Sequence, residues 1–491
     1  MTRHAPPAVV RARLLLLGLF ALTGVAFASW LARIPTVRDL LDLTTADLGL
    51  LLLVGSVGSL LTVTAAGMLL QRLGSRRVLL VSTVVIAVAF VLLGVGPTVG
   101  SRPLLALGIF LNGVAVALGN VAMNVESGRI ERALGRTVIP QFHAAFSVGA
   151  VIGSGAGALA SATGVPIAVQ LPVTAAVVVV WRLASLRGVV LGATPVEAGE
   201  RDASRASAAA VDPSRAPRGI RRAGAALGAW REPRTLLVGV VVLAAAFSEG
   251  AANNWLSLAV VDGFGRSESV GGAALGLFVA SMTVLRLLGT RLLDRFGRVA
   301  VLRASGASSV VGLLVFGFAP TLELAGAGIV LWGAGAALAV PIGIAAASDD
   351  PVRAAGRVSV VSAFASMASL VAPPVLGLAA ESVGARHALV LIVAAMITSV
   401  VVAPAVATAR AERPATGDAG PPAAAGAVPG ASSAVPSTAG DVVLDHVPAV
   451  EHVGGPGDPD RPVRPRRHRT PVQRPRTRRA AVRPLQRGGA R

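Results

Sequence analysis

Apolar residues fill this chain in long continuous blocks, not in the alternating or amphipathic patterns of a water-soluble domain. Each block has about 20 residues, the length that an α-helix needs to cross the hydrocarbon core of a bilayer. Short segments that carry arginine separate the blocks. The pattern predicts twelve transmembrane helices, at residues 14–32, 47–70, 78–96, 104–125, 140–162, 166–186, 236–261, 271–293, 300–319, 323–347, 359–381 and 388–408.

The first six blocks and the last six form a direct repeat. Arg72-Leu73-Gly74 recurs as Arg295-Phe296-Gly297, displaced by 223 residues, and the segment 26–31 recurs at 251–256, displaced by 225. Because six is an even number, both halves cross the membrane in the same orientation, as in transporters built from parallel repeats. We therefore predict an all-α membrane protein with two parallel six-helix repeats. Its expected parts are a first half at 1–187, a cytoplasmic linker at 188–235, a second half at 236–408 and a disordered tail at 409–491.

Composition supports a membrane location and limits the chemistry. Of the 491 residues 54% are hydrophobic and 14% are charged, whereas a typical soluble domain has about 25% charged residues. Cysteine is absent, which excludes disulfides and thiolate metal sites. The net charge of +20 comes largely from residues 461–491, which hold twelve arginines and no acid. That tail has no aromatic residue on which bases could stack, so we expect no nucleic-acid binding and, at most, attraction to lipid headgroups.

Arginine placement predicts the orientation in the membrane. In the first half, nine arginines lie in the N-terminal segment and near 72–77 and 126–137, whereas the opposite loops carry only Arg33, Arg38 and Arg102. Because cytoplasmic loops carry an excess of arginine and lysine, both termini are expected in the cytoplasm of a bacterial inner membrane. The apolar run at 14–32 is part of the repeat, so we interpret it as a retained helix and not as a signal peptide.

A glycine turn with clustered charges follows the second and the eighth predicted helix, at 67–77 and 291–298. Charges at such a turn can bond the end of a facing helix through its dipole and so form a latch on one side of the membrane. The pattern resembles the loop signature of the major facilitator superfamily, Gly-x-x-x-Asp-Arg-x-Gly-Arg-Arg. Gln71 replaces the acid of the first copy, and Thr290 stands where the second copy would have its glycine. The candidate latch residues are Gly67, Gln71, Arg72, Gly74, Arg76, Arg77, Arg286, Asp294, Arg295, Gly297 and Arg298.

Further segments are similar to a bacterial branch of that superfamily related to fucose permeases, which includes the YbjJ-like inner-membrane proteins. They are 27–30 with 33–35 and Arg38, 122–124 with Glu131 and Arg132, 142–143 with 146–147, 249–252 and 373–374. Two positions depart from the branch: Asn120 stands in place of an aspartate and Glu126 in place of a glutamine. The resemblance covers roughly residues 14–408. It implies a monomeric solute transporter that works by alternating access, with the first, fourth, seventh and tenth helices around a central cavity.

The seventh predicted helix carries the strongest candidate site, because ionisable residues inside a bilayer are costly and usually functional. Glu249 and Asn253 are four residues apart and share a helix face; Asn254 and Trp255 follow. A carboxylate and an amide could hydrogen-bond a sugar-like or amine-bearing solute, and Trp255 could stack on it. In the alternative interpretation, Glu249 pairs with a backbone group or an arginine and only holds helices together.

Other intramembrane polar residues each allow two interpretations. Asn120 and Asn124 could bind solute or form interhelical hydrogen bonds. Glu126 is expected to pair with Arg129 or Arg132, with a transport role as the alternative. His143 has a side-chain type that titrates near neutral pH and could exchange protons, or it could be structural. Trp30 matches Trp255 in the repeat; the pair could clamp solute or anchor at the membrane interface.

The sequence shows no nucleotide-binding motif, metal cluster or catalytic triad, so we expect no cofactor and no enzymatic activity. The predicted function is secondary active transport of a small solute, coupled to protons. Efflux of drug-like molecules is the alternative within transporters. An integral membrane sensor or enzyme is the alternative from another class.

Overall fold

The computed structural model describes residues 6–191, 228–350 and 353–407, all of which belong to one compact unit spanning 1–412. Every regular element in these residues is a helix. The linker prediction falls mainly, and the tail prediction wholly, outside the described residues. Helices suit a chain in hydrocarbon because each satisfies its own backbone hydrogen bonds. Large apolar side chains on the outside of the helices are more than half exposed, as a lipid-facing surface requires: Val84, Leu159, Val180 and Val401.

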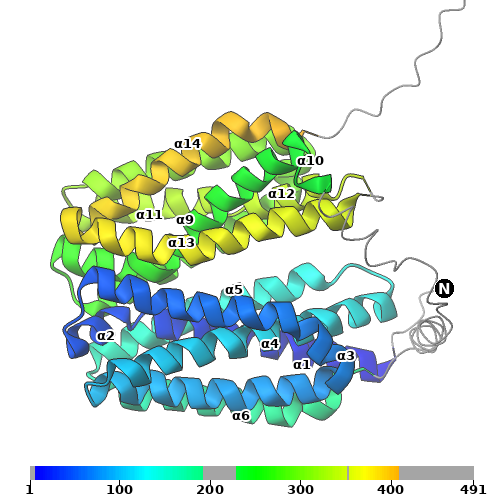
Figure 1. Cartoon of the computed structure of the whole chain (residues 1–491), viewed down its shortest axis with the longest axis horizontal. Coiled ribbons are helices and arrows are strands. Elements are labelled where there is room, and N and C mark those ends of the chain that lie inside the picture. The colour runs from blue at the N-terminus through cyan, green and yellow to red at the C-terminus, as the bar shows by residue number, and fades with distance from the viewer. Residues whose placement is uncertain (1–5, 192–227, 351–352, 408–491) are drawn as a thin grey trace, which may run out of the picture. The chain divides into compact units, whose positions relative to one another are not determined.

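The first half consists of α1 (Pro7–Leu31), the short α2 (Ile34–Leu41), α3 (Thr45–Thr98), α4 (Arg102–Leu134), α5 (Ile139–Ala162) and α6 (Ile167–Val189). The second half consists of α9 (Pro233–Phe264), α10 (Glu268–Phe318), α11 (Leu322–Ala336), α12 (Ala339–Ala347), α13 (Ala354–Ala388), α14 (Ile392–Val402) and the 3₁₀ turns η1 (Leu389–Leu391) and η2 (Ala403–Val406). Figure 1 shows the two sets of helices, the first in blue to cyan and the second in green to orange.

Three of the long helices each contain a turn at a glycine. Gly74 in α3, Gly297 in α10 and Gly384 in α13 have φ between 75° and 79° and an extended ψ, a conformation that only glycine adopts readily. Nine continuous stretches in the described residues are long and apolar enough to span a membrane, and three of them contain such a turn. These stretches therefore make twelve crossings, which confirms the predicted number.

Left-handed backbone positions recur in both halves and confirm the direct repeat. Asp42 and Gly265, each in the loop before the next crossing, have φ of 47° and 60° and lie 223 residues apart. Gly74 and Gly297 are also 223 residues apart, and both turn the chain back toward the bundle. The same backbone conformation is therefore needed at the same step of each half, which explains why short sequence matches persist there.

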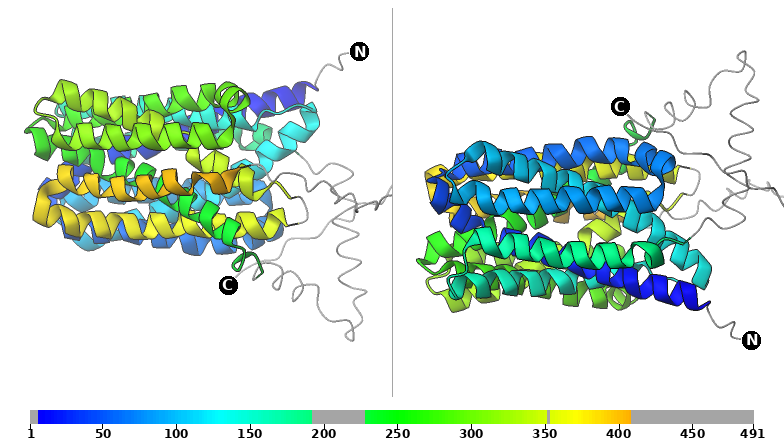
Figure 2. Two further views of the ribbon diagram at one scale, coloured as in Figure 1. Left: turned by 90° about the horizontal axis from the view of Figure 1, so that it is seen from above. Right: turned by 90° about the horizontal axis from the view of Figure 1, so that it is seen from below.

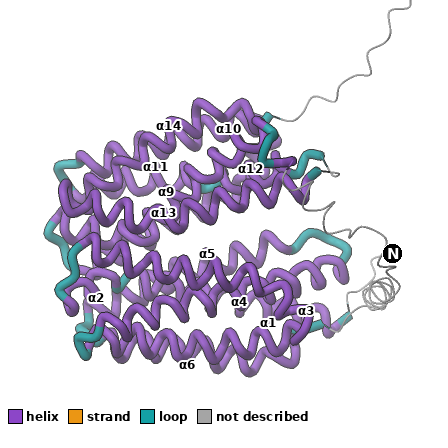
Figure 3. The backbone as a smooth tube through the Cα atoms, in the orientation of Figure 1, coloured by secondary structure: helices purple, strands orange, loops and turns teal. Residues whose placement is uncertain are grey.

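All crossings run along one common direction (Figure 2), and the loops gather at the two ends of the helices (Figure 3). We call these the α2 end, which carries α2 and the 265–267 loop, and the Gly74 end, which carries the Gly74 and Gly297 turns. Within the first half, α1 packs on α5 at backbone distance. A Cβ at Gly149 would lie 1.9 Å from the Ala21 carbonyl oxygen, and one at Gly153 would lie 2.2 Å from that of Val25. Small residues permit this approach. Between the halves, α3 packs on α13 and α5 packs on α10.

Candidate functional site

A central cavity of about 370 Å³ lies between the halves, within the size range of small-molecule sites. Its walls come from α1, α3 and α4 of the first half and from α9 and α13 of the second. Phe27 and Trp30 form an aromatic wall. The polar lining consists entirely of amides and hydroxyls, and no ionisable side chain is among the lining residues. These polar residues are Asn112, Asn253, Asn254, Ser56, Ser59, Ser366 and Ser369.

A lateral cavity of about 780 Å³ lies between α5, α10 and the α11–α12 segment. Most of its lining is apolar, and His143 and Arg286 are its only ionisable lining residues. It extends to Pro140 on α5, Leu293 on α10 and Ala345 on α12, each near the Gly74 end of its helix. The two cavities therefore differ in chemistry: the lining of the central one is polar and uncharged, and the lining of the lateral one is mostly apolar with two basic side chains.

A break in the tenth crossing positions Arg286. Pro341 has no backbone N–H, so it cannot donate to the carbonyl of Ala337 four residues earlier. The helix is interrupted there, between Ala336 at the end of α11 and Ala339 at the start of α12. Arg286 on α10 donates from Nε to the Ala337 oxygen at 3.1 Å and from Nη2 to Glu249 on α9 at 2.9 Å. One guanidinium thus satisfies the carbonyl freed by proline and ties three crossings together.

The two halves are closed against each other at the α2 end. Glu268, in the first turn of α10, accepts hydrogen bonds from the Thr36 backbone N–H at 2.9 Å and the Thr36 hydroxyl at 2.6 Å. Arg33 Nε lies 3.1 Å from its other oxygen, and both side chains are largely buried. Arg38 pairs with Asp262 at the end of α9. We call these five residues the α2 gate.

Among the residues that the structure describes, the other hydrogen bonds between the halves also lie toward the α2 end or mid-bundle. Ser154 on α5 donates to the Gly272 carbonyl at 2.6 Å, and Ser56 on α3 donates to that of Ser369 at 2.9 Å. Both cavities therefore lie on the Gly74 side of a sealed α2 end. This is one of the two closed arrangements that alternating access requires.

Comparisons with known proteins agree with this architecture. The family model described as Major Facilitator Superfamily matches residues 238–465. The transporter y4wD of Sinorhizobium fredii is 33% identical over 370 residues, which cover 75% of this chain and 90% of y4wD. The chain belongs to the major facilitator superfamily. It is a multi-pass membrane transporter, and the superfamily is not one of enzymes.

Two solved structures of this superfamily share the fold. The nucleoside transporter NupG has a TM-score of 0.60 and 15% identity, with 82% of this chain and 98% of NupG covered. The E. coli fucose:proton symporter FucP, in a variant form, has a TM-score of 0.56 and 16% identity, with 82% of this chain and all of FucP covered. At these identities the likeness concerns the arrangement of helices alone.

The structure separates the site residues predicted on the seventh crossing. Asn253 and Asn254 line the central cavity, as Trp30 does. Glu249 pairs with Arg286 and is not among the lining residues of the central cavity. Trp255 does not reach the cavity: it is 1% exposed, and its ring packs beside Gly377 on α13. The repeat places two tryptophans at matching positions, but only one of them faces the solute space.

The remaining candidates lie away from the central cavity. Asn124 is exposed and donates to the Asn120 carbonyl of its own helix at 2.8 Å. Glu126 is buried and pairs with Arg129 at 2.6 Å, which confirms the expected ion pair. Of the four helices expected around the central cavity, the first, fourth and seventh line it. The tenth lines the lateral cavity, and its place is taken by the second and eleventh crossings.

The candidate latch residues of this superfamily signature differ in their surroundings. Gly74 and Gly297 make the predicted turns, and Arg298 bonds Asp349 on the same half at 2.7 Å. Arg286 lies with Glu249 and the helix break, and not with Asp294 and Arg295 as expected. Gly67 is an ordinary helical glycine with open space where a Cβ would be. The other candidates are exposed at the Gly74 end: Gln71, Arg72, Arg76, Arg77, Asp294 and Arg295.

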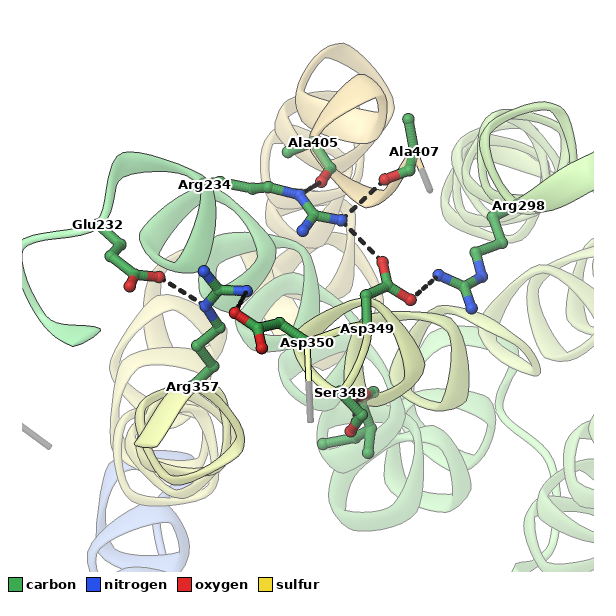
Figure 4. Close-up of polar contacts among 10 residues, drawn as sticks. Glu232, Arg234, Arg298, Ser348, Asp349, Asp350, Arg357, Ala405 and Ala407 are labelled. Atoms are coloured by element: carbon green, nitrogen blue, oxygen red, sulfur yellow. Dashed lines mark hydrogen bonds and ion pairs between the residues drawn. The ribbon is translucent and has the colours of Figure 1, made fainter. Parts of the chain in front are cut away.

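Two acidic residues that the sequence analysis missed, Asp349 and Glu232, connect helix ends of the second half at the Gly74 end (Figure 4). Asp349, just after α12, accepts from Arg298 and from Arg234 at 2.9 Å. Arg234 also donates to the Ala405 and Ala407 carbonyls at the end of the last crossing. Glu232 accepts from Arg357 at 2.6 Å. In the sequence, the signal was the acidic end of the tenth block, Asp349-Asp350, together with the arginines at the start of the seventh and eleventh blocks.

Electrostatics favour the charged form of both acids. The hydrogen bond from Arg357 lowers the pKa of Glu232 below its ordinary value. Partial burial acts to raise the pKa of Asp349, but the hydrogen bonds from Arg298 and Arg234 outweigh it and lower this pKa overall. Both carboxylates therefore stay ionised throughout the physiological pH range, and they supply no titration between pH 5.5 and 8.

Replacing Glu268 by glutamine should open the α2 gate. The amide side chain would keep the size of the original and one acceptor but lose the ion pair with Arg33, a loss of about 1–3 kcal/mol for a bond to a charged group. Because the pair exists only when the α2 end is closed, the balance should move roughly tenfold or more toward α2-open states. Spin labels on Val99→Cys and Ser382→Cys, in a chain with no native cysteine, would report a longer distance across that end. Glu323→Gln, exposed at the same end, is the matched control; equal distance distributions in both variants would contradict the gate.

Asp349→Asn should lower the free energy of unfolding by about 1–3 kcal/mol at pH 7, because two arginines lose their charged partner. The folded-state pKa of Asp349 lies below its ordinary 3.8, so its contribution is complete above pH 3.8 and is lost as the pH falls through the folded value. The deficit in the apparent Tm relative to the parent should therefore shrink near pH 3. Asp294→Asn, exposed on the same end, should cost little at either pH. A deficit that persists unchanged at pH 3 would show that Asp349 acts by shape and not by charge.

Proposed function

We propose that this chain is a secondary active transporter of a small, uncharged, polar solute, which binds in the central cavity and crosses by alternating access. The observation that carries the proposal is the cavity lining: seven amide and hydroxyl side chains, two aromatic rings and no ionisable group. Amides and hydroxyls both donate and accept hydrogen bonds, which suits a sugar-like molecule. A charged solute would have no counter-charge among these residues.

The position of the cavity supports the same proposal. Trp30 on α1 and Asn253 and Asn254 on α9 line the same cavity from different halves, so a bound solute would touch both bodies that must rock against each other. An aromatic ring stacks on the apolar face of a sugar, while amides bond its hydroxyls. The relatives in fold named above are, by name, a fucose:proton symporter and a nucleoside transporter, and both of those solutes carry sugar hydroxyls.

Efflux of amphipathic molecules is a second candidate, and the lateral cavity favours it. This cavity is about twice the volume of the central one and mainly apolar. An apolar molecule with one acidic group could lie along α5 and α10 and approach Arg286 or His143. We rank this second because Arg286 already has two partners in the structure.

We further propose that the Gly74 end faces the cytoplasm of an inner membrane. The three arginines of the first half at the α2 end each have a carboxylate partner: Arg33 with Glu268, Arg38 with Asp262 and Arg102 with Asp47. The excess of positive charge therefore lies at the Gly74 end, the side that stays in the cytoplasm by the positive-inside rule.

Single cysteines should distinguish the two ends in intact cells. Ser382→Cys at the α2 end and Thr137→Cys at the Gly74 end are both exposed, so an impermeant maleimide added outside should label the first and spare the second. Permeabilised cells, in which both should react, are the control for reactivity. If only Thr137→Cys were labelled in intact cells, the Gly74 end would face outward, and the proposed orientation would be wrong.

Filling the central cavity should stop transport without unfolding the protein. Gly250 lines the cavity, and a Cβ there would meet only open space. Gly250→Leu should therefore lower the uptake or efflux of the carried solute at least tenfold, measured with labelled fucose, xylose and uridine in membrane vesicles of both orientations.

Gly326→Leu, on α11 with equally open surroundings and outside both cavity linings, is the matched control and should transport as the parent does. Equal rates in Gly250→Leu and the parent, for a solute that the parent carries, would exclude the central cavity as the path.

A Leu287→Trp variant tests the lateral cavity. Loss of amphipathic dye efflux with unchanged sugar transport in this variant would favour the second candidate.

We propose protons as the coupling ion and Glu249 as the group that carries them. Protonation of Glu249 would release Arg286, which would keep its bond to the Ala337 carbonyl at the helix break. The three crossings tied by this guanidinium could then rearrange. Glu249→Gln keeps size and hydrogen bonding but cannot titrate, so it should exchange solute across the membrane yet fail to accumulate it against a gradient.

The measurement is accumulation and solute counterflow in proteoliposomes between pH 5.5 and 8. Glu126→Gln is the matched control, since Glu126 is also paired with an arginine but lies within the first half. If Glu249→Gln accumulates solute like the parent over this range, the pair with Arg286 only holds helices together, and His143 becomes the next residue to test.

A further inference from the structure

Arg182 on α6 is a cation buried inside the first half, away from both cavities. It is 2% exposed, and it donates to hydroxyls of two neighbouring helices. Nη1 donates to Ser82 Oγ on α3 at 2.9 Å, and Nη2 donates to Thr23 Oγ1 on α1 at 3.3 Å. Both hydroxyls donate onward to backbone carbonyls, of Ala115 and Leu19. Their lone pairs therefore face the guanidinium, and they can only accept from it.

The site has more donors than acceptors. A guanidinium has five N–H groups, and two of them are used in these bonds. Nε is buried without a partner among the described residues, and so is the hydroxyl of Ser185, three positions further along α6. Residues three apart lie on one face of a helix. The face of α6 at Arg182 and Ser185 thus presents buried N–H and O–H groups with nothing to accept them, each at a considerable cost in free energy.

The charge of Arg182 has no carboxylate to balance it in the surrounding helices. Neither α1, α5 nor α6 contains an acidic residue, and the only one in α3 is Asp47, at the opposite end of the first of its two crossings. On α4, Glu126 is bonded to Arg129 and to the Leu191 backbone N–H, and Glu131 accepts from the backbone N–H groups of Val138 and Ile139. An unbalanced charge buried in a membrane-embedded bundle is strongly unfavourable.

The backbone of α4 closes over the site. A Cβ at Gly119 would lie 2.9 Å from Ser82 Oγ and 3.3 Å from Arg182 Nη2, so the space beside the guanidinium is narrow. An occupant has to be negative, accept several hydrogen bonds and be about one atom in size. We propose that Arg182 and Ser185 bind a chloride ion inside the first half. Bonds between an ionised donor and an anion are roughly twice as strong as neutral ones, and the ion would balance the charge that the protein leaves unpaired.

This site is independent of the proposed transport path. Its four helices α1, α3, α4 and α6 belong to one half, so the ion would stabilise that half equally in inward-open and outward-open states. The effect expected is on the stability of the folded protein and not on solute coupling. In the competing explanation, the two hydroxyls alone stabilise the Arg182 side chain, and the residue connects helices without binding an ion.

The test is thermal unfolding of the purified full chain in sodium gluconate with increasing sodium chloride at constant ionic strength. The parent should show a saturable rise in apparent Tm of several degrees, and bromide should substitute for chloride. Arg182→Met should abolish this response, whatever its own stability. Arg187→Met, exposed on the same helix, should respond as the parent does.

Ser185→Ala keeps the charge and removes one donor, so it should fold and require a several-fold higher chloride concentration for half of the Tm rise. It decides the question if Arg182→Met fails to fold. Identical Tm in chloride and gluconate for the parent would overturn the proposal. So would a full chloride response in Arg182→Met or an unchanged midpoint in Ser185→Ala.

Discussion

Inside hydrocarbon a polar group can be satisfied only by the protein itself, and the rest of this structure depends on that constraint. It makes every crossing helical and confines the tight glycine turns to the ends of the bundle. The same constraint explains why one proline affects the packing of its neighbours. Pro341 frees the Ala337 carbonyl in mid-membrane, and the group that bonds it is Arg286, which also bonds Glu249. The break in one helix is in this way linked to Glu249, the only acid near the middle of the seventh crossing.

Buried charges follow the same constraint with three different outcomes. At the α2 end, Glu268 and Arg33 pair across the two halves, so their bond exists only while the halves are closed there. Glu126 and Arg129 pair within one helix and are indifferent to such a movement. Arg182 has hydroxyls alone. The first arrangement can report conformation, the second can only stabilise, and the third leaves a charge for something other than a side chain to balance.

The distribution of contacts assigns different tasks to the two ends. The bonds between the halves lie at the α2 end and mid-bundle in the part of the chain that the structure describes, whereas the acids Asp349 and Glu232 bind the ends of crossings within the second half. A bundle held in this way can separate at one end while each half stays rigid. The solute space is then defined by rigid walls, with amides from α9 of one half and aromatic rings from α1 of the other, and neither side has to deform for the halves to rock.

The sequence alone determined the number of crossings, the direct repeat and the family, because each is written in local patterns: block length, recurring turns such as Gly74 and Gly297, and short motifs. It also limited the partner of Glu126 to Arg129 or Arg132, because groups close together on one helix meet whatever the fold, and the structure shows the pair with Arg129. It did not determine which polar groups meet across helices. Trp255 and Trp30 are equivalent in the repeat, yet only Trp30 lines the cavity, because α13 covers the other ring. Arg286 was assigned to the latch by its closeness in sequence to Asp294, but it bonds residues 37 and 51 positions away. The rotation and packing of whole helices decide such encounters, and no local pattern encodes them.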